Sequence, residues 1–207
     1  MMSNAEIVRL KNGVNDHDHS QGPGSAPVTL LEYGNFECSD CRRAYPVIKK
    51  VQKVLNVNLR FIFRHFPTVR THPHSLRAAE AAEAASVQGK FWEMHDQLYT
   101  HQQALDDDDL SRYAARIGLD IDTFTRCMAD KTFLKQIEVD YQRALFDEHI
   151  TGTPTFYIND VRYTGAIDEE NLVLAIREAD TEGRIPLPEM SGRLKRIFRR
   201  LHFRASN

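Results

Sequence analysis

The feature that most constrains this chain is a pair of cysteines, Cys38 and Cys41, separated by two residues in GNFECSDCRR at 34–43. The preceding run PVTLLEYG is rich in apolar and β-branched residues and ends at a glycine, which predicts a buried strand. The following stretch CRRAYPVIKKVQKVL has apolar residues at helical spacing, with Pro46 expected to kink the helix. The pair therefore lies where a strand passes directly into a helix.

This strand-to-helix junction suits thiol chemistry. Cys38 falls at the N-terminus of the predicted helix, where unpaired backbone N–H groups and the positive end of the helix dipole stabilise a thiolate. Cys41 follows one turn inside the helix, better covered and close enough to form a disulfide with Cys38. We expect Cys38 to be the attacking thiolate and Cys41 the resolving thiol.

A zinc site is the alternative use of a close cysteine pair. A closed zinc site needs four ligands, usually in two close pairs, and the third cysteine, Cys127, stands alone in a helical pattern where a buried inert thiol is expected. The histidine-containing segments DHDHSQGPGSAP and THPHSLRAAE are interpreted as a turn-rich loop and a helix start. No metal site is therefore expected.

Charge and hydropathy narrow the partners and the compartment. The 207 residues include 27 Lys and Arg against 29 Asp and Glu, a formal net charge of −2, so no overall field attracts nucleic acid or an anionic membrane. The start MMSNAEIVRLKNG lacks the apolar run of a signal peptide, and no stretch has the roughly 18 apolar residues of a spanning helix. We expect a cytoplasmic protein, in which a close cysteine pair is redox-active and not a structural disulfide.

The rest of the chain has a recognisable order of elements. A second strand is predicted at VNLRFIFRHF, and TPTFYINDVRYTG predicts two short strands joined at a turn. A last amphipathic helix is predicted over 168–179. Between these halves, 68–149 shows helical periodicity or strong helix formers throughout. The order is a βαβ half, a helical block and a ββα half, which indicates an α/β fold with an all-helical insertion.

Several separated motifs make residues 17–180 resemble the DsbA-like thioredoxin-fold thiol-disulfide oxidoreductases. They are the Cys-Ser-Asp-Cys sequence, FRHFP after the next strand, QGKFWEMHDQLY in the helical block and TGTPTFYIND before the final hairpin. The resemblance implies a thioredoxin-like fold, with a central mixed sheet flanked by helices and an inserted all-helical domain. The expected division of the chain is an N-terminal segment (1–26), the first half of the fold (27–67), the helical insertion (68–149), the second half (150–183) and a basic amphipathic tail (184–207).

The resemblance also assigns roles beyond the cysteines. It implies a cis bond before Pro154 in a loop that faces the disulfide, so that Thr153 presents its backbone to an extended substrate strand. It places Glu32 below the disulfide as a buried acid that takes the proton of Cys41, directly or through water. An acid inside an apolar strand costs free energy unless it is used or paired. The alternative is an ordinary carboxylate at an exposed strand end.

The chain departs from the resemblance around its first cysteine. Many relatives have an aromatic residue or a histidine before the second cysteine, whereas this chain has Asp40, and Glu37 immediately precedes Cys38. We expect Glu37, Ser39 and Asp40 to modulate the Cys38 pKa, the two carboxylates by repelling the thiolate. The expected pKa of about 6 to 7.5 favours a reductase or thiol-repair role over disulfide introduction.

The C-terminal tail lies outside the resemblance. SGRLKRIFRRLHFRAS places apolar residues along one helical face with basic side chains around the rest. One interpretation is a solvated or partner-packed terminal helix. The other is a weak contact with a membrane surface or an acidic partner.

The sequence thus predicts an enzyme that exchanges disulfides with protein or peptide thiols and is regenerated by a redox partner. No flavin, nicotinamide or metal is expected because the electrons reside in the cysteine pair. Nucleic acid is not an expected partner. Two alternatives stay open. One is a non-catalytic redox-sensing or partner-binding module of the same fold, and the other is a relative of the thioredoxin-fold glutathione transferases and isomerases, which would not need Cys41.

Overall fold

A five-stranded mixed sheet forms the centre of the protein. The computed structural model describes residues 7–185, and its strands lie in the order β1-β3-β2-β4-β5. β2 and β3 are parallel, and the other neighbours are antiparallel. The strand bounds are β1 His19–Gln21, β2 Val28–Gly34, β3 Leu59–His65, β4 Thr155–Ile158 and β5 Val161–Tyr163. The predicted thioredoxin-like fold is confirmed.

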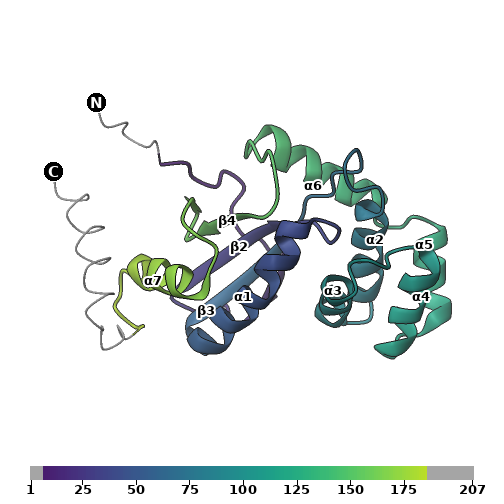
Figure 1. The fold of residues 1–207 in the computed structure, drawn as a ribbon, viewed down its shortest axis with the longest axis horizontal. Helices are drawn as coiled ribbons and strands as arrows, with labels where there is room; N and C mark the ends of the chain where they lie inside the picture. Colours follow the sequence, from purple (N-terminus) through teal and green to yellow (C-terminus); the bar gives the residue numbers. More distant parts are fainter. Residues whose placement is uncertain (1–6, 186–207) are drawn as a thin grey trace.

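The helices divide into those that flank the sheet and those of the insertion between β3 and β4. Figure 1 shows α1 and α7 along the sheet and α2 to α5 gathered at one end of it. A single 3-10 turn, Asn56–Asn58, links α1 to β3. The helix bounds are α1 Ser39–Leu55, α2 Ser75–Ser86, α3 Phe91–Thr100, α4 Asp107–Arg116, α5 Ile121–Ala129, α6 Leu134–Phe146 and α7 Glu169–Ala179.

The central strand β2 is buried on both faces, which explains its continuous apolar sequence. Leu30 packs in the main core with residues of α1, α7 and the helical insertion. Leu31 and Tyr33 point to the other face, into a smaller core that includes Ala144 of α6. The sheet is therefore covered by helices on both sides, and β2 is buried up to its end at Gly34.

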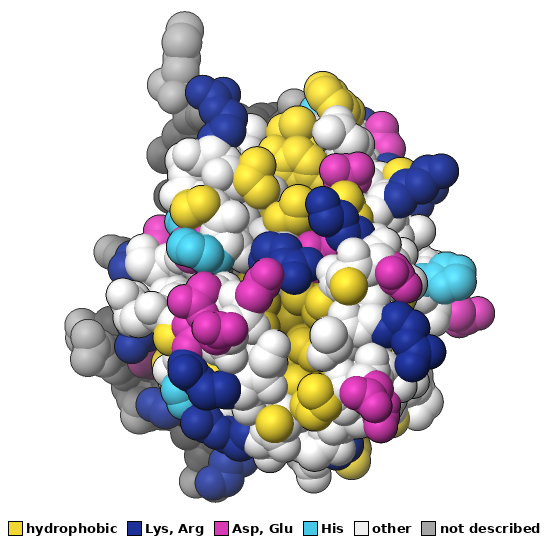
Figure 2. Space-filling model, turned by 90° about the vertical axis from the view of Figure 1, so that its right-hand side faces the viewer, with side chains coloured by type: hydrophobic (Ala, Val, Ile, Leu, Met, Phe, Trp, Pro, Cys, Tyr) yellow, Lys and Arg dark blue, Asp and Glu magenta, His cyan; other side chains and the backbone are white. Residues whose placement is uncertain are grey.

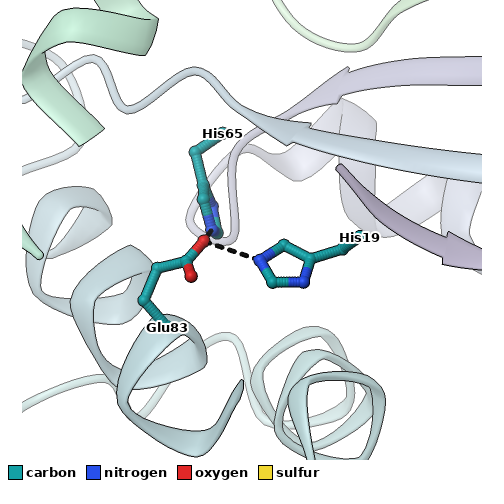
Figure 3. Close-up of side chains that lie close together, drawn as sticks. All are labelled: His19, His65 and Glu83. Carbon is teal, nitrogen blue, oxygen red and sulfur yellow. Dashed lines mark hydrogen bonds and ion pairs between the residues drawn. The ribbon is translucent and has the colours of Figure 1, made fainter. Parts of the chain in front are cut away.

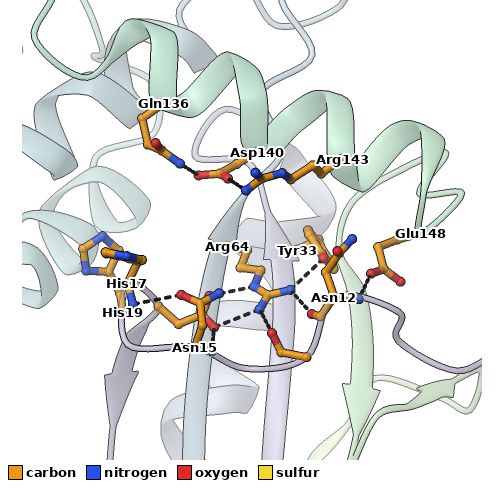
Figure 4. A network of polar contacts seen from close by, with 12 residues as sticks. Asn12, Asn15, His17, His19, Tyr33, Arg64, Gln136, Asp140, Arg143 and Glu148 are labelled. Atoms are coloured by element: carbon orange, nitrogen blue, oxygen red, sulfur yellow. Dashed lines mark hydrogen bonds and ion pairs between the residues drawn. The ribbon is translucent and has the colours of Figure 1, made fainter.

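The N-terminal segment is more ordered than the predicted turn-rich loop. It contains β1, which pairs antiparallel with β3 at the edge of the sheet. Arg64 donates to both carboxylate oxygens of Asp18 at 2.7 and 2.8 Å and also binds the carbonyls of Asn12 and Gly13 and the hydroxyl of Tyr33 (Figure 4). One partly buried guanidinium thus ties this segment to two central strands.

The surface at the α4 and α5 end carries charged side chains of both signs, with hydrophobic side chains gathered in a band between them (Figure 2). No helix within residues 7–185 has both the length and the apolar character needed to cross a membrane.

Cys127, expected to be buried, is a free thiol that is partly buried against the main core. The predicted basic tail lies outside the described residues.

Candidate functional site

The start of α1 and the loop before β4 bring the candidate site residues together. Cys38 is the N-cap residue of α1, and Cys41 is buried in the first turn. The Thr153–Pro154 peptide bond is cis. Across this junction the Cys38 thiol donates to the carbonyl oxygen of Thr153 at 3.3 Å. Residues 115 positions apart in the sequence therefore form one site.

The pKa of Cys38 is lowered to about 5. The main cause is the hydrogen bond from the Cys41 thiol, and the side chain of Thr153 and the backbone N–H groups of Cys41 and Asp40 act in the same direction. Burial opposes them, because it penalises the charged form. The bond from the Cys38 thiol to the Thr153 carbonyl also favours the protonated form, yet the donors around the sulfur outweigh both effects.

The pKa of about 5 lies below the expected range of 6 to 7.5, and each of the two neighbouring carboxylates is bound to another residue. Asp40 is exposed and forms an ion pair with Arg43. Glu37 accepts from the backbone N–H of His74 at 2.7 Å and lies 2.9 Å from its Nδ1. Neither carboxylate is among the main causes of the Cys38 shift, which are hydrogen bonds and burial. Their expected repulsion of the thiolate stays a prediction.

Ser39 is the first residue of α1 and is exposed. Its side chain is not among the main causes of the shift of the Cys38 pKa. The pKa is set instead by the backbone of the first helical turn and by Cys41, so the residues between the cysteines act through their main chain more than through their side chains.

Cys41 lies in the opposite environment. Its side chain is fully buried, and burial raises its pKa well above 9, with Cys38 and Glu32 acting in the same direction. Glu32 is itself buried in β2 between Phe63 of β3 and Phe156 of β4. Desolvation, followed by repulsion from Cys38, raises the pKa of Glu32 to about 8. A protonatable acid thus lies within the electrostatic reach of both sulfurs.

Two functional candidates from the helical insertion escaped sequence reasoning. The hydroxyl of Tyr99 in α3 is buried without a hydrogen-bond partner, and its pKa is raised by burial and then by Cys41 and Glu32. The side-chain amide of Gln102, just after α3, donates to the carbonyls of Phe36 at 2.7 Å and Cys38 at 2.8 Å. The QGKFWEMHDQLY motif pointed to this helix but not to these two roles.

A polar groove lies beside the Cys38 loop, between that loop and the insertion. Residues from both regions line it, including Glu37, His74, Gln102 and Asp106. Most of the residues that line this groove are polar or charged.

One other group of side chains has the composition of a metal site. Among residues 7–185, His19, His65 and Glu83 are the one set of three His, Cys, Asp or Glu residues whose ligand atoms converge within 4.8 Å. They come from β1, β3 and α2, away from the cysteines in the sequence. Cys38 and Cys41 belong to no such set.

Comparison with known proteins shows which family and which solved structures this chain is similar to. A family model described as Thioredoxin matches residues 14–178. A thioredoxin-like oxidoreductase from Silicibacter pomeroyi superposes with a TM-score of 0.71 at 25% identity, covering 80% of this chain and 93% of that one. Wolbachia pipientis alpha-DsbA1 has a TM-score of 0.71 at 23% identity, covering 82% and 94%. Both structures superpose on most of this chain and therefore share its fold.

The curated proteins that are similar in sequence are named as ion transporters and not as oxidoreductases. A Salinispora tropica protein called Na(+)/H(+) antiporter NhaA 3 is 42% identical over 170 residues, which are 82% of this chain and 26% of that protein. A Salinispora arenicola protein called Na(+)/H(+) antiporter NhaA 1 is 43% identical over 164 residues, 79% of this chain and 25% of that protein. The chain thus spans about a quarter of the length of these relatives.

Proposed function

We propose, from the premise that this chain belongs to the thioredoxin family and has its DsbA-like fold, that it is a thiol-disulfide oxidoreductase acting on protein or peptide thiols. The observation that carries the proposal is the division between two neighbouring thiols. Cys38 has a lowered pKa at the start of a helix, while Cys41 behind it has a raised one. Such a pair supplies one nucleophile and one thiol held in reserve.

The first step is an attack by the Cys38 thiolate on one sulfur of a substrate disulfide. A bond forms between Cys38 and that sulfur, the substrate disulfide breaks, and the second substrate thiolate leaves and takes a proton from water. Thr153 holds the extended substrate through its backbone beside the attacking sulfur. The contact between the Cys38 sulfur and the Thr153 carbonyl supports this placement.

The second step releases the substrate. Cys41 gives its proton to the carboxylate form of Glu32 and attacks the Cys38 sulfur, so that the intramolecular disulfide forms and the mixed disulfide breaks. The substrate leaves as a thiolate, reduced by two electrons in all, and the protein is oxidised by two. A Glu32 pKa of about 8 suits this transfer, since the group exchanges protons near neutral pH. The reverse sequence introduces a disulfide into a dithiol.

The Cys38 pKa of about 5 favours the oxidising direction. A stabilised thiolate stabilises the reduced protein and makes its disulfide a stronger oxidant. This reverses the reductase role expected from the two carboxylates. We retain the cytoplasm as a proposal on the sequence alone, and there a redox partner has to regenerate the disulfide.

The test is a pair of assays on the wild type and on Cys41→Ser. The oxidised wild type should transfer its disulfide to a reduced peptide, and the reduced wild type should accelerate the reduction of insulin by dithiothreitol. Equilibration against glutathione gives the reduction potential and decides the direction. No rate above background in either assay would refute the proposal, and undiminished turnover in Cys41→Ser would favour the glutathione-transferase alternative.

The antiporter relatives favour a second candidate function. About a quarter of each of these proteins matches this chain. This suggests that the domain works beside a membrane ion transporter and senses or changes the oxidation state of the transporter's thiols. In that case the cysteine pair would act as a sensor. Slow exchange with peptides, together with oxidation by mild oxidants and binding to an antiporter in a pull-down, would support this function over the enzymatic one.

A further inference from the structure

A second site lies where β1, β3 and α2 meet. Nε2 of His19 is 2.8 Å from Oε1 of Glu83, and Nε2 of His65 is 3.0 Å from the same oxygen. Figure 3 shows both imidazoles directed at this carboxylate from separate strands. All three ligand atoms lie within 4.8 Å of one another. We propose that His19, His65 and Glu83 form a binding site for a divalent transition-metal ion, with Zn²⁺ as the expected occupant.

The two separations from the Glu83 oxygen fit such an ion. Zinc bonds to histidine nitrogen and carboxylate oxygen are about 2.0 to 2.2 Å long. Two ligands at about 2.05 Å whose atoms are 2.8 to 3.0 Å apart subtend an angle of about 90° at the metal. That is the angle of neighbouring ligands on one face of an octahedron. A widening of a few tenths of an ångström gives the tetrahedral angle that zinc prefers.

Both imidazoles are held in place by contacts that do not involve the metal. The ring of His19 stacks on Phe91, with centroids 3.5 Å apart and planes 8° from parallel. The ring of His65 packs edge-on against Phe36 and Phe63. Packing therefore directs both Nε2 atoms at Glu83, and little ordering remains to be done when an ion binds.

The ligand chemistry selects the class of ion. Two imidazoles and one carboxylate suit zinc and its neighbours in the first transition series, whereas Ca²⁺ and Mg²⁺ prefer oxygen ligands alone. Three protein ligands leave a position for water or a further ligand. His19 and Glu83 are partly exposed, with 21% and 17% of their side-chain surfaces accessible, so that an ion can enter from solvent.

A hydrogen-bonded triad without metal is the competing explanation. In that arrangement both histidines donate through Nε2–H to one oxygen, whereas in the metal site the Nε2 lone pairs face the ion and the protons reside on Nδ1. The sequence argument against zinc counted ligands around the cysteines. It had no means of joining His19 to a histidine and a glutamate that lie 46 and 64 residues away.

The experiment uses the full chain with its Cys38–Cys41 disulfide formed, so that these thiols cannot bind the metal. Zn²⁺ binding is measured by calorimetry, and Co²⁺ serves as the spectroscopic probe. We expect one ion per chain, with visible d–d bands and no sulfur-to-cobalt charge-transfer band. A charge-transfer band would assign the ion to Cys127 and overturn the proposal, and so would the absence of one-to-one binding.

Variants locate the site. His19→Gln and Glu83→Gln should each weaken Zn²⁺ binding more than about tenfold, the lower range for loss of an outer-shell partner, because each removes a direct ligand. His17→Ala, in the same segment but with an exposed side chain, should leave the affinity unchanged. Near-ultraviolet circular dichroism in excess chelator shows whether each variant is folded. If Glu83→Gln does not fold, His19→Gln, at the edge of the sheet, is enough to test the site. Wild-type affinity in a folded His19→Gln would overturn the proposal.

Discussion

Cys38 and Cys41 place identical thiols at the two ends of the first turn of α1, in opposite environments. At the N-cap, Cys38 meets backbone N–H groups and a donated thiol proton, and its pKa falls to about 5. Three residues later Cys41 is enclosed by the core next to a buried acid, and its pKa rises well above 9. The contrast shows that position on the helix and burial, rather than residue type, give the two thiols opposite pKa shifts.

The contrast also points to a role for the buried carboxyl of Glu32, next to Cys41. A thiol with a raised pKa attacks only after it loses its proton, and Glu32 is the titratable group there whose pKa lies nearest neutrality. The Cys38 end is governed by hydrogen bonds and the Cys41 end by desolvation. Changes at the two ends should therefore differ both in size and in the property that they alter.

The largest effect is expected from substituting the cysteines themselves. Cys38→Ser should reduce disulfide exchange to the background rate, a loss of several orders of magnitude, because it removes the thiolate. Cys41→Ser should keep the first step and accumulate mixed disulfides, visible on non-reducing gels and by mass spectrometry. Cys127→Ser is the matched control and should behave as the wild type. Mixed disulfides that form through Cys41 in Cys38→Ser would reverse the assignment.

Glu32→Gln should have the next largest effect. The amide keeps the shape of the side chain but takes up no proton, so release of the mixed disulfide should slow about 100-fold, the lower range for general acid–base catalysis. The alkylation rate of Cys38 should change much less. Stopped-flow measurement of both steps separates them. Equal slowing of attack and release would show that Glu32 does not act on Cys41.

The same variant changes the dependence of stability on pH. The Glu32 pKa is raised from 4.5 to about 8, so the folded protein retains a proton that the unfolded chain releases between those values. This contribution is complete below pH 4.5 and is lost as the pH rises through about 8. At about 1.4 kcal/mol per pKa unit it amounts to several kcal/mol. Glu32→Gln should therefore gain stability relative to the wild type as the pH rises across this range, as urea unfolding would measure.

Sequence reasoning reached the local parts of this site and missed the distant ones. β2, α1 and the helical block follow from apolar periodicity, because their residues are neighbours in the sequence. β1 was missed because His-Ser-Gln has no apolar alternation, and pairing with β3 creates the strand. The contacts of Gln102 with Cys38 and of His74 with Glu37 join residues 64 and 37 positions apart, and no local pattern encodes them.

Gln102→Ala tests whether the insertion supports the Cys38 end in particular. The substitution leaves the buried carbonyls of Phe36 and Cys38 without this donor, which should lower the free energy of unfolding by about 1 to 3 kcal/mol. Urea unfolding measures this loss. Gln103→Ala, with an exposed side chain, is the matched control. Equal stability of the two variants would show that Gln102 does not hold the loop.

The smallest effect is expected from Asp40→Asn. Asp40 is about half exposed and pairs with Arg43, and its main contribution to the Cys38 shift comes from its backbone N–H, which the substitution retains. Water and salt screen a charge in that position. The midpoint of iodoacetamide alkylation against pH should lie near 5 in the wild type and move by no more than about 0.3 units in the variant, or about 0.4 kcal/mol.

Glu37→Gln sharpens this comparison because Glu37 is less exposed and is bound to His74. The amide retains one acceptor for the His74 backbone N–H, so the loop should keep its shape while the charge is lost. If the carboxylates next to Cys38 controlled its thiolate, both substitutions would lower the alkylation midpoint by a full unit or more. Two small shifts would instead establish that the main chain of the first helical turn and the Cys41 thiol hold the charge.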